Sequence, residues 1–235
     1  MGGVFRFKKF SVDQTDCAMK VNTDGVLLGA VAAGVRDEKI LDIGAGTGVI
    51  ALMLAQRFPE SMVEAVEIDE SAANTCEANF KNSPFSNRLR LIKGSFADYP
   101  APDKTYDLIV SNPPFFLDSL KSEKKPKEVA RHTNIGFFKD LFTYSLRCLS
   151  DQGSLWLILP TATASAVSHL ATDVGLTVNC EITIRSFAHS VPHRKIIRYG
   201  IRKTEYRSED LVIYDHEKVY STEYKKLLQN FLLIF

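Results

Sequence analysis

A glycine-rich turn, DIGAGTG, occupies residues 42–48 and limits the possible folds more than any other part of the chain. The turn follows a short apolar run at 39–44 and precedes a helix-compatible stretch at 47–58, which Pro59 ends. Glycines between a strand and a helix let the backbone approach a bound ligand closely. The turn therefore predicts a nucleoside-cofactor site formed by Asp42, Gly44, Ala45, Gly46 and Gly48.

The same alternation of strand and helix continues along the chain. Further apolar or β-branched runs that predict strands lie at 63–68, 89–94, 106–111, 154–160, 177–187 and 195–203. Helix-compatible stretches lie at 70–82, 137–149 and 161–174. Such alternation predicts parallel strands with crossover helices, and the last two runs predict an antiparallel hairpin. We expect an α/β, Rossmann-like fold with a doubly wound, mostly parallel seven-stranded sheet and an antiparallel hairpin at its edge.

Composition limits the other possibilities. A chain of 235 residues with 45% apolar and 24% charged residues fits a single domain over 1–235. The formal net charge of +1 gives no general sign of a polyanionic partner. Four dispersed cysteines without a CxxC pair, and a start unlike a signal peptide, favour a cytoplasmic protein without structural zinc. Apolar runs such as 155–159 are too short to cross a membrane.

Two carboxylates, Glu67 and Asp69, end the second predicted strand. A carboxylate at this place can accept hydrogen bonds from both ribose hydroxyls of a cofactor, and we assign that role to Glu67; the adjoining Ile68 would also contact the cofactor. A dinucleotide fingerprint would be GxGxxG, whereas here the third glycine comes one residue early and Val49 takes its place. The alternative is an ordinary tight turn beside solvated acids.

A second motif, SNPPFF at 111–116, directly follows the fourth predicted strand. It would emerge at the carboxyl edge of the sheet, where ligands of such folds bind. The Asn112 amide oxygen and the Pro113 carbonyl can accept both N–H groups of an exocyclic amine and aim its lone pair at an activated methyl group. Phe115, after Pro114, would stack on a base. Alternatively, the prolines form a rigid loop and Asn112 only caps the turn.

Together, DIGAGTG, the strand-end acid and NPPF resemble the class I S-adenosylmethionine-dependent amino-methyltransferases over about residues 20–160. The segments FRFKKFSVDQTDCAMKVNTDGVLLGA (5–30), ARHTN (130–134) and FFKDL (137–141) resemble the bacterial tRNA1(Val) (adenine(37)-N6)-methyltransferases. This resemblance implies methyl transfer from S-adenosylmethionine to N6 of adenosine 37 in tRNA, by a monomeric cytoplasmic enzyme that needs no metal and no membrane.

The resemblance also implies roles for residues outside the two motifs. Lys20, Thr23 and Asp24 would flank the methionine end of the cofactor, Asp98 would approach its adenine ring, and Asn112 would border it. Alternatively, residues 23–25 only cap the next helix and Asp98 is a loop carboxylate. In this interpretation 1–36 contribute to the site, 37–175 form the core and 176–235 add edge strands and a tail.

Local charge offers a place for RNA. Between Arg185 and Arg207 there are seven basic residues and one acid, Glu205. Such clusters hold phosphates, and Phe5, Phe7 and Phe10 could stack on bases. The alternative is solvated strand faces and core phenylalanines. His132, His189 and His193 have no partner ligands at zinc-like spacing.

Three other functions fit parts of the pattern. A protein glutamine N5-methyltransferase would present a similar amide to the NPPF turn. A nicotinamide-dependent oxidoreductase would use a similar sheet, but the glycine spacing and the NPPF turn argue against it. A non-catalytic RNA-binding protein could retain the fold, although the intact Asp42, Glu67 and Asn112 argue against lost chemistry.

Overall fold

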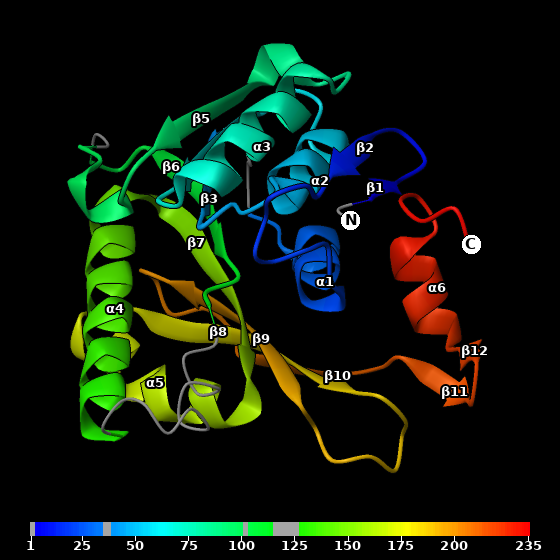
Figure 1. The fold of residues 1–235 in the computed structure, drawn as a ribbon. Helices are drawn as coiled ribbons and strands as arrows, with labels where there is room; N and C mark the ends of the chain where they lie inside the picture. The colour runs from blue at the N-terminus through cyan, green and yellow to red at the C-terminus, as the bar shows by residue number, and fades with distance from the viewer. Residues whose placement is uncertain (1–2, 35–38, 101–102, 115–126) are drawn as a thin grey trace.

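The computed structural model describes residues 3–34, 39–100, 103–114 and 127–235 (Figure 1), with the backbone alone at 127–134. Its centre is an eight-stranded sheet in the order β10-β8-β9-β7-β6-β3-β4-β5. In chain order, these strands are β3 (Lys39–Ile43), β4 (Met62–Glu67), β5 (Leu89–Lys93), β6 (Tyr106–Ser111), β7 (Leu149–Pro160), β8 (Thr177–Arg185), β9 (Arg194–Gly200) and β10 (Arg207–Val212).

Strand direction confirms the predicted fold class. Neighbours from β5 to β7 pair in parallel, and β9 pairs antiparallel with both β7 and β8. The seven expected strands are all present, but β10 adds an eighth by pairing in parallel with β8. The hairpin therefore does not form the edge of the sheet. The first four residues of β10 are polar and exposed, so it has no apolar pattern that would have revealed it.

Helices cover both faces of the sheet, as doubly wound folds require. They are α1 (Thr23–Val31), α2 (Val49–Arg57), α3 (Glu70–Lys81), α4 (Lys127–Cys148), α5 (Thr161–Asp173) and α6 (Thr222–Leu228). Apolar residues of α1, α2, α3 and α6 form one core cluster and those of α4 and α5 another. Ile40 and Leu41, adjacent on β3, belong to opposite clusters because side chains alternate along a strand. α4 begins ten residues before the predicted start at position 137. The prediction missed these residues because the first turns of the helix lack an apolar period.

The two ends of the chain lie side by side (Figure 1). The N-terminal hairpin of β1 (Val4–Arg6) and β2 (Ser11–Asp13) leads into a bridge between Phe7 and Leu232. Phe7 and Phe10 are buried, with ring centroids 4.4 Å apart. The expectation that these two rings stack on RNA is therefore wrong, because the hydrophobic core holds them.

Short elements complete the fold. The 3-10 turns Ser86–Arg88 and Phe96–Asp98 flank β5, and a small ribbon of β11 (Tyr214–His216) and β12 (Val219–Tyr220) precedes α6. The sheet order brings the ends of β3, β4 and β6 to one carboxyl edge, because these three strands are parallel neighbours.

Candidate active site

The glycine turn at the end of β3 has two different parts. Gly44, Gly46 and Gly48 have φ values of +75°, +56° and +80°, which L side chains rarely adopt. A Cβ on Gly48 would lie 2.7 Å from the Phe80 ring, so this glycine allows α2 and α3 to approach. A Cβ on Gly44 or Gly46 would meet no atom within 4 Å. The first two glycines therefore border open space, where a ligand can approach the backbone.

Glu67 fixes the shape of this turn from the end of β4. Its Oε2 accepts a hydrogen bond from Gly46 N at 2.7 Å, and its Oε1 accepts one from Asp69 N at 2.9 Å. Asp69 instead caps α3, because its Oδ1 accepts from Ala72 N at 2.8 Å. The adjoining Ile68 is 73% exposed. The structure thus brings Glu67 and the glycine turn together and gives Asp69 a different task.

Asp42 is a buried carboxylate directly beneath the turn. Its Oδ2 accepts from Ala51 N at 3.1 Å, whereas its Oδ1 has no hydrogen-bond partner among the described residues. Burial, with a smaller contribution from the Glu67 carboxylate, raises the pKa of Asp42 to about 7. A buried oxygen without a partner is costly, so this one suits contact with a bound group or a water molecule.

Asn112 follows β6 at the same edge. Ile43 and Ser111 are paired across β3 and β6, and the Ser111 hydroxyl donates to Ile43 O at 2.7 Å, so the NPPF turn begins beside the glycine turn. Asn112 is 7% exposed; its Nδ2 donates to Met19 Sδ at 3.9 Å, and its buried Oδ1 has no partner among the described residues. Pro113 is buried and Pro114 exposed, while Phe115 lies outside the described residues.

The segment before α1 differs in detail from the expectation. Asn22 caps the helix, because its Oδ1 accepts from Gly25 N at 2.9 Å, whereas Lys20 and Thr23 are exposed. Asp24 is held by a partner that the sequence did not indicate: its Oδ2 accepts from Arg194 Nε of β9 at 2.7 Å. The Asp24 carboxylate is thus already neutralised by protein.

Asp98 is exposed in the short turn after β5. Because β5 is the parallel neighbour of β4, this turn lies along the same carboxyl edge as Glu67. The position is compatible with the predicted role of Asp98 beside a base.

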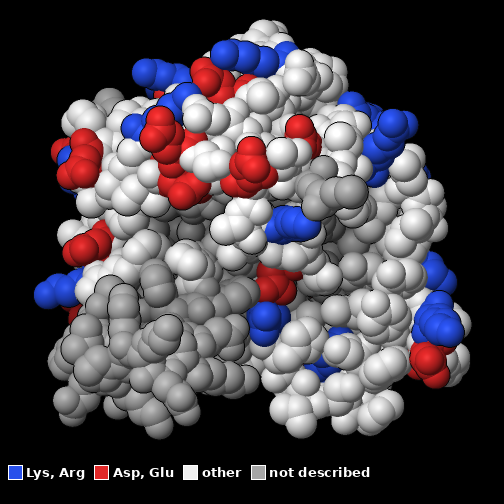
Figure 2. Space-filling model, in the orientation of Figure 1, with Lys and Arg blue, Asp and Glu red and all other residues white. Residues whose placement is uncertain are grey.

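The basic cluster near β9 is largely neutralised by ion pairs. Arg185 pairs with Asp210 at 3.1 Å and Lys195 with Glu181 at 2.8 Å. Arg202 Nη2 lies 3.9 Å from Asp151 Oδ2, and Arg194 is paired with Asp24. Both acidic and basic side chains occur over the described part of the face in Figure 2. The cluster therefore offers fewer free cations than its sequence indicated.

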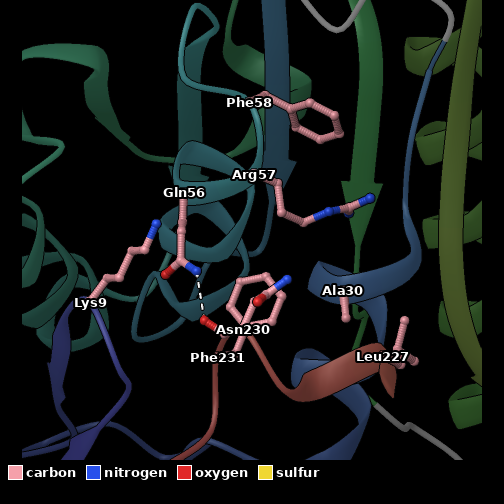
Figure 3. Close-up of a pocket in the computed structure, with 8 residues that line it drawn as sticks. All are labelled: Lys9, Ala30, Gln56, Arg57, Phe58, Leu227, Asn230 and Phe231. Atoms are coloured by element: carbon pink, nitrogen blue, oxygen red, sulfur yellow. Dashed lines mark hydrogen bonds between the residues drawn. The ribbon is translucent and has the colours of Figure 1, made fainter. Parts of the chain in front are cut away.

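A cavity of about 530 Å³ lies elsewhere in the molecule (Figure 3). It is lined by Lys9, Ala30, Gln56, Arg57, Phe58, Leu227, Asn230 and Phe231. Gln56 Nε2 donates to Asn230 O at 2.9 Å across it. Because the cavity lies at the end of α2 opposite the glycine turn, it is separate from the candidate active site.

The described residues contain neither a candidate metal site nor a candidate membrane span. No group of three or more His, Cys, Asp or Glu side chains there is arranged to hold a metal ion. None of the helices in the described part of the chain combines the length and apolar character of a membrane span.

Known proteins resemble this chain over most of its length. Residues 9–175 match the model of the methyltransferase small domain family. A tRNA1(Val) (adenine(37)-N6)-methyltransferase of Pedobacter heparinus is 47% identical over 235 residues, which cover 100% of both chains. A predicted O-methyltransferase from Agrobacterium tumefaciens has a similar fold, with a TM-score of 0.69 at 18% identity over 88% of this chain and 96% of that one. P. horikoshii TYW2, solved in complex with MeSAdo, has a TM-score of 0.59 at 14% identity over 86% and 72%.

Proposed function

The chain belongs to the family of tRNA1(Val) (adenine(37)-N6)-methyltransferases, and on that premise we propose that it methylates N6 of adenosine 37 in tRNA1(Val), with S-adenosylmethionine as donor. The observation that carries the proposal is the Asn112 carboxamide. It presents a buried acceptor oxygen, without a partner among the described residues, beside a glycine turn suited to a nucleoside. An amine donor is the complement of such an oxygen.

The residues present fit S-adenosylmethionine. Gly44 and Gly46 leave a cradle that any Cβ would enter, and Glu67 is held where its carboxylate can also accept from ribose hydroxyls. Asp42 Oδ1 offers a second unpartnered acceptor beneath the turn. When bound, S-adenosylmethionine supplies a methyl group made electrophilic by its sulfonium.

Further contacts extend this proposal along the carboxyl edge. Ile68 and Asp98 would border the adenine ring, and the exposed Lys20 and Thr23 would face the methionine end. Arg194 holds Oδ2 of Asp24, so a contact of Asp24 with the methionine end would use its other carboxylate oxygen or its backbone.

Asn112 and Pro113 would orient the substrate. The Asn112 Oδ1 and the Pro113 carbonyl accept the two N–H groups of the adenine amine, which directs the nitrogen lone pair away from both. The buried position strengthens these hydrogen bonds as positive charge develops on the nitrogen. No strong base is required before attack, and stacking by Phe115 remains a prediction.

We further propose that the protein as a whole is a single-domain, monomeric enzyme of the cytoplasm. Its N-terminal residues 1–36 would complete the site. The four cysteines are free and buried, which agrees with a reducing compartment. Family membership favours RNA over the alternative glutamine substrate and removes the support for an oxidoreductase.

The test is incubation of the purified protein with methyl-labelled S-adenosylmethionine and unmodified tRNA1(Val), followed by nucleoside mass spectrometry. We expect labelled N6-methyladenosine, and no label in a transcript where guanosine replaces adenosine 37. If the cofactor binds and no nucleoside is labelled, the RNA assignment is wrong and glutamine-containing protein is the next substrate. Failure to bind the cofactor at all would refute the methyltransferase function.

A further inference from the structure

The two ends of the Asn112 carboxamide have different surroundings. Its nitrogen donates to the Met19 thioether at 3.9 Å, and its oxygen is buried without a partner among the described residues. An asparagine amide can rotate by half a turn and exchange these two ends with little change in shape. Only the observed orientation directs the oxygen away from Met19.

A thioether sulfur selects between the two orientations. It accepts hydrogen bonds weakly and has no proton to donate. With the amide nitrogen toward it, the sulfur has a donor; with the amide oxygen toward it, two acceptors would face each other. Met19 therefore favours the orientation that leaves Oδ1 free for an amine donor.

The segment that carries Met19 is anchored to the body of the protein. Thr75 and Ser71 of α3 donate through their hydroxyls to the carbonyls of Thr15 and Asp16, at 2.8 and 2.9 Å. Gln14 Oε1 accepts from Val21 N at 2.8 Å and closes the segment into a loop. These contacts bracket Met19 on both sides, although its own side chain is 37% exposed.

We infer that Met19 is a positioning residue, which fixes the Asn112 carboxamide so that its oxygen receives the substrate amine. The inference rests on the proposed function, because it assigns a task to a residue that need not touch the substrate. It also gives the N-terminal segment a role in the chemical step itself, in addition to cofactor binding.

The variant that tests this is Met19→Leu, which nearly conserves volume and removes the acceptor. The control is Met62→Leu, because Met62 is also partly exposed, at 47%, and begins β4 at the edge opposite Glu67. We expect kcat to fall about two- to threefold in Met19→Leu, the lower end of the value of a hydrogen bond because a thioether accepts weakly, with KM for tRNA and cofactor affinity unchanged. Met62→Leu should match the wild type.

A spectroscopic measurement tests the contact between Met19 and the Asn112 amide without relying on turnover. The side-chain amide resonances of Asn112 in ¹⁵N-labelled protein can be assigned by their absence in Asn112→Ala. We expect them to shift in Met19→Leu and to stay in place in Met62→Leu.

The outcomes separate this inference from the proposed function. Unchanged kcat, unchanged Asn112 resonances, or a loss confined to KM or cofactor affinity in Met19→Leu would overturn the role of Met19 while N6-methylation stands. A wild-type protein that does not methylate tRNA would overturn the proposed function, and the resonances would still decide whether Met19 contacts the Asn112 amide.

Discussion

Two buried asparagines, Asn112 at the carboxyl edge and Asn179 on β8, differ in their hydrogen bonding. Asn112, like the nearby Asp42, keeps one buried oxygen without a partner among the described residues. Asn179 is satisfied at both ends: its Nδ2 donates to Arg202 O and its Oδ1 accepts from Thr204 N. Arg185 of β8 and Lys195 of β9 are held in ion pairs.

This difference fits a binding role for Asn112 and a structural role for Asn179. An unsatisfied buried polar group costs free energy, and a ligand that completes its hydrogen bond recovers that cost. Satisfied groups stabilise the fold and leave little for a ligand to gain. Local sequence does not separate the two, because both regions contain the same kinds of residues.

The largest expected effect comes from the two asparagines. Asn112→Ala should lower kcat by about 10²- to 10³-fold, because the amine loses a positioning acceptor, while cofactor affinity stays nearly constant. Asn179→Ala should retain kcat and lower the free energy of unfolding by about 1–3 kcal/mol, because two backbone groups lose their partner. Steady-state kinetics and urea unfolding of both variants make the comparison. Equal losses of activity would remove Asn112 from the mechanism.

Glu67 and Asp69 provide the next test. Glu67→Gln replaces an oxygen that accepts a backbone N–H with an amide nitrogen, so the glycine turn and the ribose contact should both weaken. We expect cofactor affinity to fall about 10- to 100-fold by calorimetry. Asp69→Asn keeps the cap on α3 and should bind the cofactor within about twofold of the wild type. The reverse ranking would assign the ribose to Asp69.

The raised pKa of Asp42 should make the free energy of unfolding depend on pH. Its pKa is raised in the folded state, so the folded protein holds this proton more tightly than the unfolded chain does. The stability from this group is complete below its ordinary pKa of 3.8 and is lost as the pH rises toward about 7. Asp42→Asn retains an acceptor for Ala51 N and removes the titration. The difference in unfolding free energy between the two proteins should therefore change over this window and level off above it; a constant difference from pH 4 to 7 would contradict the assignment.

The smallest expected effect concerns RNA affinity. Lys203 and Arg207 are exposed, and neither has an ion pair with a described residue. Neutralising both, as Lys203→Gln with Arg207→Gln, should weaken tRNA binding about two- to fivefold and reduce its salt dependence. Arg185→Gln should leave tRNA affinity nearly unchanged, because that cation is already paired with Asp210. Binding titrations at several salt concentrations measure this, and a larger loss in Arg185→Gln would show that the ion pair opens to RNA.

Most of the fold follows from local pattern. The glycine turn and the apolar runs located β3 to β9, because the period of buried residues records which elements face the core. Two features that the sequence analysis did not predict share one cause. β10 begins with four exposed polar residues, and α4 begins with turns that lack an apolar period, so neither start carried a signal.

The chemistry of the site can be predicted from local motifs: a glycine turn for a nucleoside, an acid at the next strand end and an asparagine before two prolines. Their meeting could be inferred as well, since the carboxyl ends of neighbouring parallel strands share one edge. The tertiary structure alone decided which groups are already occupied. Arg194 binds Asp24, which lies 170 positions away in the sequence, and Met19 contacts Asn112 over a separation of 93 positions. Such contacts depend on strand order and segment packing, which hydrophobic periodicity does not encode, and they separate a free acceptor from a satisfied one.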